Sequence, residues 1–221
     1  MVERKLDVPT KIFIFRHGET DWNAASRLQG HSDIPLNANG RAQSLQLRWV
    51  FQKNKIEHIF SSDLKRALET AQIAAGEGNS IPLTTHKELR ECYLGQSEGL
   101  THDEIRARFT EAVWQQWTSI EPKDMTFRLP GGESKLEAVT RASTFLKSAL
   151  FARPELKTVV VAVHGLLMRR WFLTLRPDLA ATFTTPNCVC FEMQFDHATQ
   201  TFQMPNANPL SAGSGHSPDD R

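Results

Sequence analysis

Two arginines and two histidines stand where predicted strands end. The segment FIFRHGETDWN runs from apolar residues directly into Arg16 and His17. The apolar run KTVVVAV is followed by His164, and EHIFS leads through SDLK to Arg66 in the first turn of the next predicted helix. Because ligands bind at the carboxyl edge of an open α/β sheet, we expect these four side chains to meet there.

Such a set of side chains suits a tetrahedral phosphoryl group. Arginine binds phosphate through parallel, charge-assisted hydrogen bonds, and helix amino termini add amide donors. A neutral imidazole can attack phosphorus and form a covalent phosphoenzyme, and neighbouring guanidiniums should lower its pKa and keep it neutral at neutral pH. A second, protonated imidazole can stabilise the charge that develops on the equatorial oxygens.

The leaving oxygen needs a proton, which a carboxyl group can supply. Glu91, in the segment LRECYLGQSEG, is the candidate general acid. From the residues alone, Glu19, Glu88 and Glu98 remain open as alternatives.

A metal site is another possible use of the histidines. His31, His102 and Cys92 could be combined with His17, but the sequence contains no tight pair of metal ligands. We therefore predict that the site needs no metal.

The elements that must position these residues alternate along the chain. Strands are predicted at 11–15, 57–61, 157–163 and 188–195, with weaker candidates near 82–86 and 199–204. Helical patterns lie at 37–53, 63–76, 101–118, 134–152 and 165–175. This alternation predicts an α/β sandwich.

Two of the predicted helices begin with a capping box, at Thr101 with Glu104 and at Ser134 with Glu137. The second of these helices carries a broad apolar stripe, which should pack on the sheet. The stripe consists of Leu136, Val139, Thr140, Phe145, Leu146, Ala149 and Leu150.

Composition narrows the class of protein. The 221 residues carry a formal net charge of +1 without a block of lysine or arginine, so neither nucleic acid nor an anionic membrane is the expected partner. No apolar run approaches the roughly 20 residues of a membrane span, and the opening segment lacks a signal-peptide pattern, so we expect a cytoplasmic protein. The three cysteines should be reduced core thiols, with Cys188 and Cys190 on one face of a strand.

The length allows one large domain, which we place at 1–204. The segment 205–221 is rich in Pro, Gly, Ser and Asn, and we expect it to be a disordered tail.

Six blocks stand in the order seen in the histidine phosphatase superfamily, also called the phosphoglycerate mutase-like family, which this chain resembles. They are RHGETDWN, LQGHSDIPLNANG, SSDLKRALETA, LRECYLGQSEG, PGGES and VHGLLMR. The resemblance runs from about Lys11 to about Phe195, and it implies a three-layer α/β/α sandwich with a mixed, mostly parallel sheet and no metal or other cofactor.

The resemblance also implies roles for individual residues. His17 matches the phosphorylated nucleophile, Arg16 and Arg66 match phosphate-binding arginines, and His164 matches the second histidine of the phosphate pocket. Glu91 matches the acid and base that serves first the leaving group and then the attacking water.

Four further positions match the region around the substrate. Asn23 matches a polar phosphate contact, Gln29 and Gly30 match a loop near the pocket mouth, and Gly165 completes the HG block. This chain has Leu166 where the family usually has a second glycine, and that residue should narrow the floor of the pocket.

Members of this family are phosphatases or mutases. Phosphoglycerate mutases carry a basic insertion before the second histidine, whereas residues 106–134 here contain no Arg-Arg pair. We therefore expect a phosphatase acting on a small phosphorylated metabolite, with a phosphoglycerate mutase or a catalytically silent phosphate-binding module as alternatives. Neither the particular ester nor the oligomeric state is predicted.

The same segment is aromatic and could form a lid over the pocket. Its aromatic side chains are Phe109, Trp114, Trp117 and Phe127. A lid of this kind would favour a leaving group with apolar or ring-bearing parts. The two tryptophans are three residues apart on a helical pattern, so core packing is the alternative.

Overall fold

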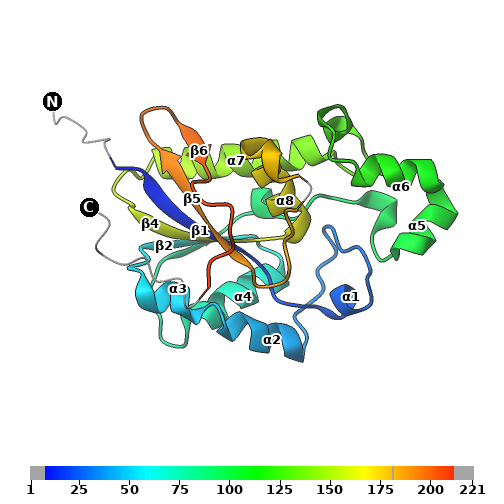
Figure 1. Ribbon diagram of the computed structural model, residues 1–221. Coiled ribbons are helices and arrows are strands. Elements are labelled where there is room, and N and C mark those ends of the chain that lie inside the picture. The colour runs from blue at the N-terminus through cyan, green and yellow to red at the C-terminus, as the bar shows by residue number, and fades with distance from the viewer. Residues whose placement is uncertain (1–7, 181, 212–221) are drawn as a thin grey trace.

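The computed structural model describes residues 8–180 and 182–211, which form a six-stranded sheet with helices on both faces (Figure 1). The strands are β1 (Thr10–Arg16), β2 (His58–Ser61), β3 (Leu83–Thr85), β4 (Thr158–Val163), β5 (Cys190–Asp196) and β6 (Thr201–Gln203). Their order across the sheet is β3-β2-β4-β1-β5-β6. The first four run parallel, β5 is antiparallel to β1, and β6 is antiparallel to β5. The predicted α/β class and mixed, mostly parallel sheet are confirmed.

Two of the predicted helices are each divided in the structure. The helices are α1 (Asp21–Ala24), α2 (Ala38–Leu45), α3 (Arg48–Lys53), α4 (Lys65–Ala75), α5 (His102–Phe109), α6 (Glu111–Thr118), α7 (Lys135–Phe151) and α8 (Gly165–Leu175). Short 3-10 turns lie at η1 (Lys87–Leu89), η2 (Gly95–Ser97), η3 (Pro122–Thr126) and η4 (Pro177–Leu179). The predicted helix 101–118 breaks at Thr110, whose φ of 78° lies outside the right-handed helical region. The predicted helix 37–53 breaks between α2 and α3.

Alternation along β1 explains the two helical layers. Ile12 and Ile14 belong to a core cluster that includes residues of α7 and α8, whereas Phe13 and Phe15 belong to a cluster with residues of α3 and α4. Successive side chains of a strand point to opposite faces, so both faces of this strand are buried. In Figure 1, α7 and α8 cover one face and α3 and α4 the other, while α5 and α6 extend beyond the sheet. Buried on both sides, the strand is a rigid support for the residues that follow it.

The predicted capping boxes are present, but the apolar stripe of α7 differs from the prediction. Thr101 and Ser134 each accept a hydrogen bond from the backbone of the glutamate three residues later, and that glutamate bonds back to the capping residue. Leu136, however, is 43% exposed and Thr140 is also exposed, because both lie off the line of buried side chains on α7. That line is Val139, Ala142, Leu146 and Leu150.

The cysteines and the carboxyl-terminal segment also differ from expectation in part. Cys92, Cys188 and Cys190 are free thiols, as predicted. Cys188 has a φ of 55° and precedes β5, so it does not share a strand face with Cys190. The backbone N–H of Leu210 donates to the Cys190 carbonyl at 2.8 Å, so the chain still contacts the sheet beyond residue 204. Residues 212–221 of the predicted tail lie outside the described residues.

Within the described ranges, no helix is long and apolar enough to cross a membrane.

Candidate active site

The register between β1 and β4 brings His17 and His164 together. Arg16 pairs with Val163 at the ends of these parallel strands, and the backbone N–H of His17 donates to the Val163 carbonyl at 3.0 Å. The next residue on each strand is a histidine, and the two ring centroids lie 5.2 Å apart. The hydrogen-bonding pattern of the sheet therefore places both imidazoles at the same edge.

Hydrogen bonding and burial set the state of the His17 ring. Its Nδ1 lies 2.7 Å from the Gly18 carbonyl, which can only accept, so Nδ1 carries the proton and Nε2 is the unprotonated nitrogen. The side chain is buried, and burial lowers its pKa well below the ordinary value, with further lowering by the charges of Arg66 and Arg16. A neutral imidazole with a free Nε2 lone pair is the nucleophilic form.

His164 differs from the expectation that it is protonated. The residue is fully buried and neither ring nitrogen has a hydrogen-bond partner among the described residues. Burial lowers its pKa well below the ordinary value, and the charges of Arg66 and His17 lower it further. In the unliganded protein this ring is therefore neutral at neutral pH.

The lowered pKa values of His17 and His164 predict that both rings titrate below the ordinary histidine range. In the folded protein, the carbon-13 resonances of Cε1 in His17 and His164 should keep their neutral positions below pH 6.5, the ordinary histidine value. In urea both should titrate near about 6.5. The unfolded state then binds more protons, so these rings reduce the free energy of unfolding as the pH falls through that value. Folded-state titration of either ring near the ordinary value would contradict the prediction.

Backbone carbonyls orient the two arginines. Nη1 of Arg16 donates to the Thr185 carbonyl at 2.7 Å. Arg66 is fully buried and donates to the carbonyls of Ser32 at 2.7 Å and Gly30 at 2.8 Å. The Nε atoms of both arginines are buried and have no partner among the described residues. Burial lowers the pKa of Arg66 to about 10, which leaves it cationic at neutral pH.

Glycines in the RHG and HG motifs, Gly18 and Gly165, permit close packing next to the two histidines. A Cβ at Gly165 would lie 2.9 Å from Nε of Arg16. A Cβ at Gly18 would lie 2.4 Å from the Gly40 carbonyl oxygen. Both positions need glycine because a neighbouring group occupies the space of the side chain.

The carboxylate of Glu91 is held at the amino terminus of α8. Its Oε2 accepts from the backbone N–H of Leu166 at 2.9 Å. Its Oε1 accepts from those of Leu167 at 2.7 Å and Cys92 at 2.9 Å. These donors fix the carboxylate beside the arginines, since exposed amides of a helix amino terminus attract an anion.

The alternative carboxylates serve elsewhere. Glu19 accepts from the Asn37 side chain at 3.0 Å, and Glu98 accepts from the backbone amides of His31 and Ser32. Within the part of the chain that the structure describes, Glu91 is the only carboxylate that lines the cavity beside His17.

Arg141 supports the loop that carries Glu91, a role that the sequence analysis missed. Its guanidinium donates to the carbonyls of Glu88 at 2.7 Å, Arg90 at 2.9 Å and Glu91 at 2.7 Å. It also forms an ion pair with Glu133. One side chain thereby holds three carbonyls, within four residues, of a loop that has little regular structure.

Replacing Arg141 with glutamine is expected to lower the free energy of unfolding by about 2–3 kcal/mol, because several partly buried carbonyls lose their donor. The control is Arg128→Gln, which removes an exposed ion pair with Glu137 and should cost less than about 1 kcal/mol. Urea unfolding of both variants measures the difference. If Arg141→Gln lowers the free energy of unfolding no more than Arg128→Gln does, the loop does not depend on Arg141.

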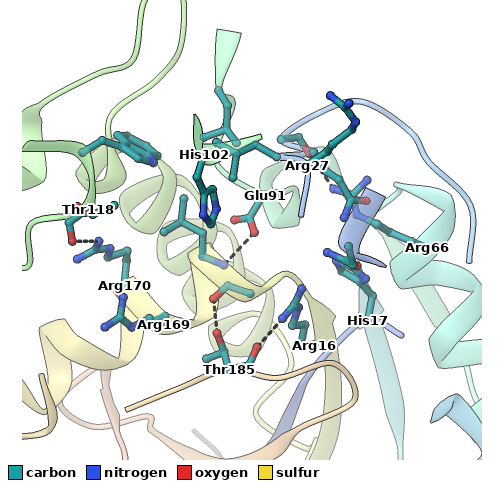
Figure 2. A pocket seen from close by; sticks show the side chains of 18 of the residues that line it. Arg16, His17, Arg27, Arg66, Glu91, His102, Thr118, Arg169, Arg170 and Thr185 are labelled. Atoms are coloured by element: carbon teal, nitrogen blue, oxygen red, sulfur yellow. Dashed lines mark hydrogen bonds between the residues drawn. The ribbon is translucent and has the colours of Figure 1, made fainter. Parts of the chain in front are cut away.

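These residues surround a cavity of about 330 Å³ (Figure 2). The predicted site residues that line it are Arg16, His17, Asn23, Gln29, Gly30, Arg66, Glu91 and Gly165. His164 is not in the lining and lies against His17. Oδ1 of Asn23 accepts from the Asn187 side chain at 3.3 Å, and Oε1 of Gln29 is buried with no partner among the described residues.

The cavity has further polar residues for which no role in phosphate binding or catalysis was predicted. They are Arg27, His102, Thr118, Arg169, Arg170 and Thr185. Arg169 lies four residues, or about one helical turn, beyond Gly165, and this spacing is a sequence signal that could have found it. Thr185 lies in a loop whose sequence carries no such signal.

Two of the four residues of the aromatic segment lie at the cavity, in its wall. Trp114 and Trp117, both on α6, line the cavity, whereas Phe109 and Phe127 pack against the core outside the lining. The tryptophans are also mostly buried, so they serve both the core and the cavity wall.

The proposed metal ligands do not converge. Nε2 of His31 lies 2.9 Å from the Glu91 carbonyl, and His102 packs against Trp114 with ring centroids 4.7 Å apart. Among residues 8–180 and 182–211, no group of three or more His, Cys, Asp or Glu side chains could hold a metal ion.

An α/β sheet with a histidine- and arginine-lined cavity at the carboxyl edge of its parallel strands defines the class of the protein. The chain belongs to the histidine phosphatase superfamily, branch 1, whose family model matches residues 12–208. The match covers nearly all of the described part.

Relatives and solved structures agree with this assignment. The chain is 35% identical over 172 residues to phosphoglycerate mutase-like protein 4 of Arabidopsis thaliana, covering 76% of this chain and 72% of the relative. It is 33% identical over 164 residues to glucosyl-3-phosphoglycerate phosphatase of Mycobacterium tuberculosis, covering 70% of each. Bacillus stearothermophilus YhfR superposes with a TM-score of 0.79 at 29% identity, covering 92% of this chain and 98% of that one. A mycobacterial glucosyl-3-phosphoglycerate phosphatase in complex with VO3 gives 0.73 at 29% identity, covering 83% and 92%. The chain is therefore an enzyme of this superfamily, with phosphatase or mutase activity.

Proposed function

We propose that the protein is a phosphatase that hydrolyses a small phosphate monoester through a phosphohistidine on His17. One observation carries the proposal: a buried imidazole presents an unprotonated Nε2 in a cavity that Arg16 and Arg66 also line. The arginines retain buried Nε donors for the phosphoryl oxygens. A nucleophile and cations around one cavity are the requirements for attack on a phosphate ester.

In the first step, the Nε2 lone pair of His17 forms a bond to phosphorus as the bond to the leaving oxygen breaks. Glu91 gives its proton to that oxygen, so the product leaves as an alcohol. Arg16 and Arg66 stabilise the charge on the equatorial oxygens. Arrival of the phosphoryl group favours a proton on His164, because a nearby anion raises the pKa of a buried imidazole.

In the second step, water attacks the phosphohistidine. Glu91 takes a proton from the water as the new oxygen–phosphorus bond forms and the nitrogen–phosphorus bond breaks. Inorganic phosphate leaves and His17 returns to its neutral form. The same carboxyl group thus acts as acid and then as base.

A phosphoglycerate mutase is the second candidate, because relatives carry that name. The absence of an Arg-Arg pair in residues 106–134 favours the phosphatase. Phosphorus NMR distinguishes the two, with 3-phosphoglycerate and a trace of 2,3-bisphosphoglycerate in one tube and p-nitrophenyl phosphate in another. Free phosphate without 2-phosphoglycerate supports the phosphatase, whereas rapid formation of 2-phosphoglycerate would refute it. If neither 3-phosphoglycerate nor p-nitrophenyl phosphate is consumed, both proposed activities are refuted.

Trp114 and Trp117 at the cavity wall support an ester whose leaving group has an apolar or ring-bearing part. Benzyl phosphate should therefore have a KM roughly 10-fold lower than ethyl phosphate, since an added ring buries apolar area worth a few kcal/mol at most. Initial rates of phosphate release measure both constants. Equal KM values would exclude this preference.

A further inference from the structure

The peptide group between Gly18 and Glu19 determines which nitrogen of His17 carries the proton. Its carbonyl oxygen lies 2.7 Å from Nδ1 of His17, and a carbonyl can only accept, so the proton stays on Nδ1. Nε2, the nitrogen that attacks phosphorus, stays unprotonated only while this carbonyl points at the ring. The orientation of one backbone carbonyl therefore controls the nucleophile.

Residue 18 is a glycine because the backbone around it packs closely against α2. A Cβ at Gly18 would clash with the Gly40 carbonyl oxygen, and a Cβ at Gly40 would clash with the backbone of Glu19. Glycine populates a wide range of backbone angles, so its presence leaves the direction of the Gly18 carbonyl free to vary. Hydrogen bonds to the peptide groups on the two sides of its Cα have to supply the restraint.

Side chains from two different helices hold these two peptide groups. The N–H of Gly18 donates to Oγ1 of Thr70 on α4 at 2.9 Å, and this buried hydroxyl donates in turn to the Arg66 carbonyl at 2.7 Å. The N–H of Glu19 donates to Oε1 of Gln43 on α2 at 3.0 Å. That N–H belongs to the same planar peptide group as the Gly18 carbonyl, so Gln43 holds the plane in which this carbonyl lies.

The start of α2 places Gln43 beside this peptide group. Gln43 lies three residues after Gly40, on the same face of the helix. Asn37 caps the helix, because its side chain accepts from the Gly40 N–H at 2.8 Å. The N–H of Asn37 also donates to the Glu19 carbonyl at 3.0 Å. The helix is therefore joined to Glu19 at two points, the Asn37 N–H and the Gln43 side chain.

We propose that Gln43 is a positioning residue that acts on His17 through the Gly18–Glu19 peptide group. The three groups form one hydrogen-bonded chain, in which Oε1 of Gln43 accepts from the peptide N–H and the peptide carbonyl accepts from Nδ1 of His17. An acceptor on the N–H polarises the peptide group and strengthens its carbonyl as an acceptor. Gln43 thereby keeps the lone pair on Nε2, although it is not in the lining of the active-site cavity.

The effect of Gln43 on turnover rests on the proposed role of His17 as the nucleophile, whereas its effect on the tautomer does not. Burial lowers the pKa of His17 well below the ordinary value, so at neutral pH the ring is neutral and has a single proton to place. The tautomer can therefore be measured in the protein without substrate, separately from any activity.

Nitrogen-15 NMR of protein labelled in its histidines tests the proposal, because the shifts of Nδ1 and Nε2 report which nitrogen is protonated. The variant is Gln43→Met, which keeps the length of the side chain and removes the acceptor. The His17 signals are identified by their loss in His17→Ala. The unmodified protein should show His17 protonated on Nδ1 alone, and Gln43→Met should populate the Nε2–H tautomer to a measurable degree.

Turnover supplies a second readout for Gln43. Gln43→Met should lower kcat for p-nitrophenyl phosphate about 10-fold, as expected when a buried peptide N–H loses its acceptor. Competitive inhibition by inorganic phosphate should change less than about 2-fold, since the arginines that bind the anion are untouched.

Two further variants separate the hydrogen bond from the shape of the side chain. Gln43→Glu keeps an oxygen acceptor for the Glu19 N–H and should restore both the tautomer and most of kcat. The control is Gln46→Met, the same substitution at an exposed position at the end of α2, which should leave both unchanged.

The outcomes separate this proposal from the proposed function. An unaltered Nδ1–H tautomer in folded Gln43→Met would overturn the role of Gln43, and so would an Nε2–H share in Gln43→Glu as large as in Gln43→Met. An Nε2–H tautomer in the unmodified protein would overturn it even if no variant folds. Absence of p-nitrophenyl phosphate hydrolysis by the unmodified protein would instead refute the phosphatase, and the tautomer measurement would still decide the role of Gln43.

Discussion

Replacing His17 with alanine should lower kcat for p-nitrophenyl phosphate by at least about 10⁴-fold, because the substitution removes the atom that forms the covalent bond. The fold should persist, since β1 is buried on both faces and paired on both edges by β4 and β5. The control is His86→Asn, outside the cavity, where asparagine keeps an acceptor for the Glu88 N–H. It should retain the unmodified rate.

Rapid acid-free quenching supplies a second readout for His17. Intact-protein mass spectrometry of the unmodified enzyme under turnover should show an adduct of one phosphoryl group, and the adduct should be absent from His17→Ala. Substantial hydrolysis by the folded alanine variant would refute the covalent mechanism. A phosphoryl adduct in His17→Ala would show that another residue is the nucleophile.

Replacing Glu91 with glutamine should slow alkyl phosphates by about 10²–10⁴-fold, because a poor leaving group needs a proton from the enzyme. Glutamine has nearly the same shape and keeps one carbonyl oxygen for the α8 amides, but it cannot donate an acidic proton. p-Nitrophenyl phosphate should be slowed much less in its first step, since nitrophenolate leaves unprotonated.

The measurement for Glu91 is the dependence of kcat/KM on the leaving-group pKa across a series of aryl and alkyl phosphates. The dependence should become steeper in Glu91→Gln than in the unmodified enzyme. Glu88→Gln, outside the active-site cavity, is the matched control and should leave the dependence unchanged. Equal slowing of all esters by Glu91→Gln would assign the proton to another group.

Local sequence signals were sufficient for the strands and for the residues at their ends, whereas two predicted helices are divided in the structure and α1 was not predicted. The strands were predicted within about two residues, because each is a short apolar run bounded by polar or turn residues. The prediction that Arg16, His17, Arg66 and His164 meet at one edge required only that the strands run parallel. Both capping boxes were evident because they involve residues three positions apart.

Other features depended on contacts between distant residues. The position of the Glu91 carboxylate at the cavity depends on amides of α8, which lie about 75 positions away in the chain. The support by Arg141 follows from carbonyls about 50 positions away. The neutral state of His164 follows from its burial, which no local pattern reveals.

The sequence by itself determined the α/β class, the strand ends that present Arg16, His17 and His164, and the family. Periodicity, capping and motif order are properties of neighbouring residues, so they can be recognised without coordinates. Only the tertiary structure decided which carboxylate lines the cavity, that two tryptophans form its wall, and that Arg169 and Arg170 lie at its far side. Burial, charge and hydrogen-bond satisfaction depend on which distant segments come together, and here residues of α6 and α8 line the same cavity as His17.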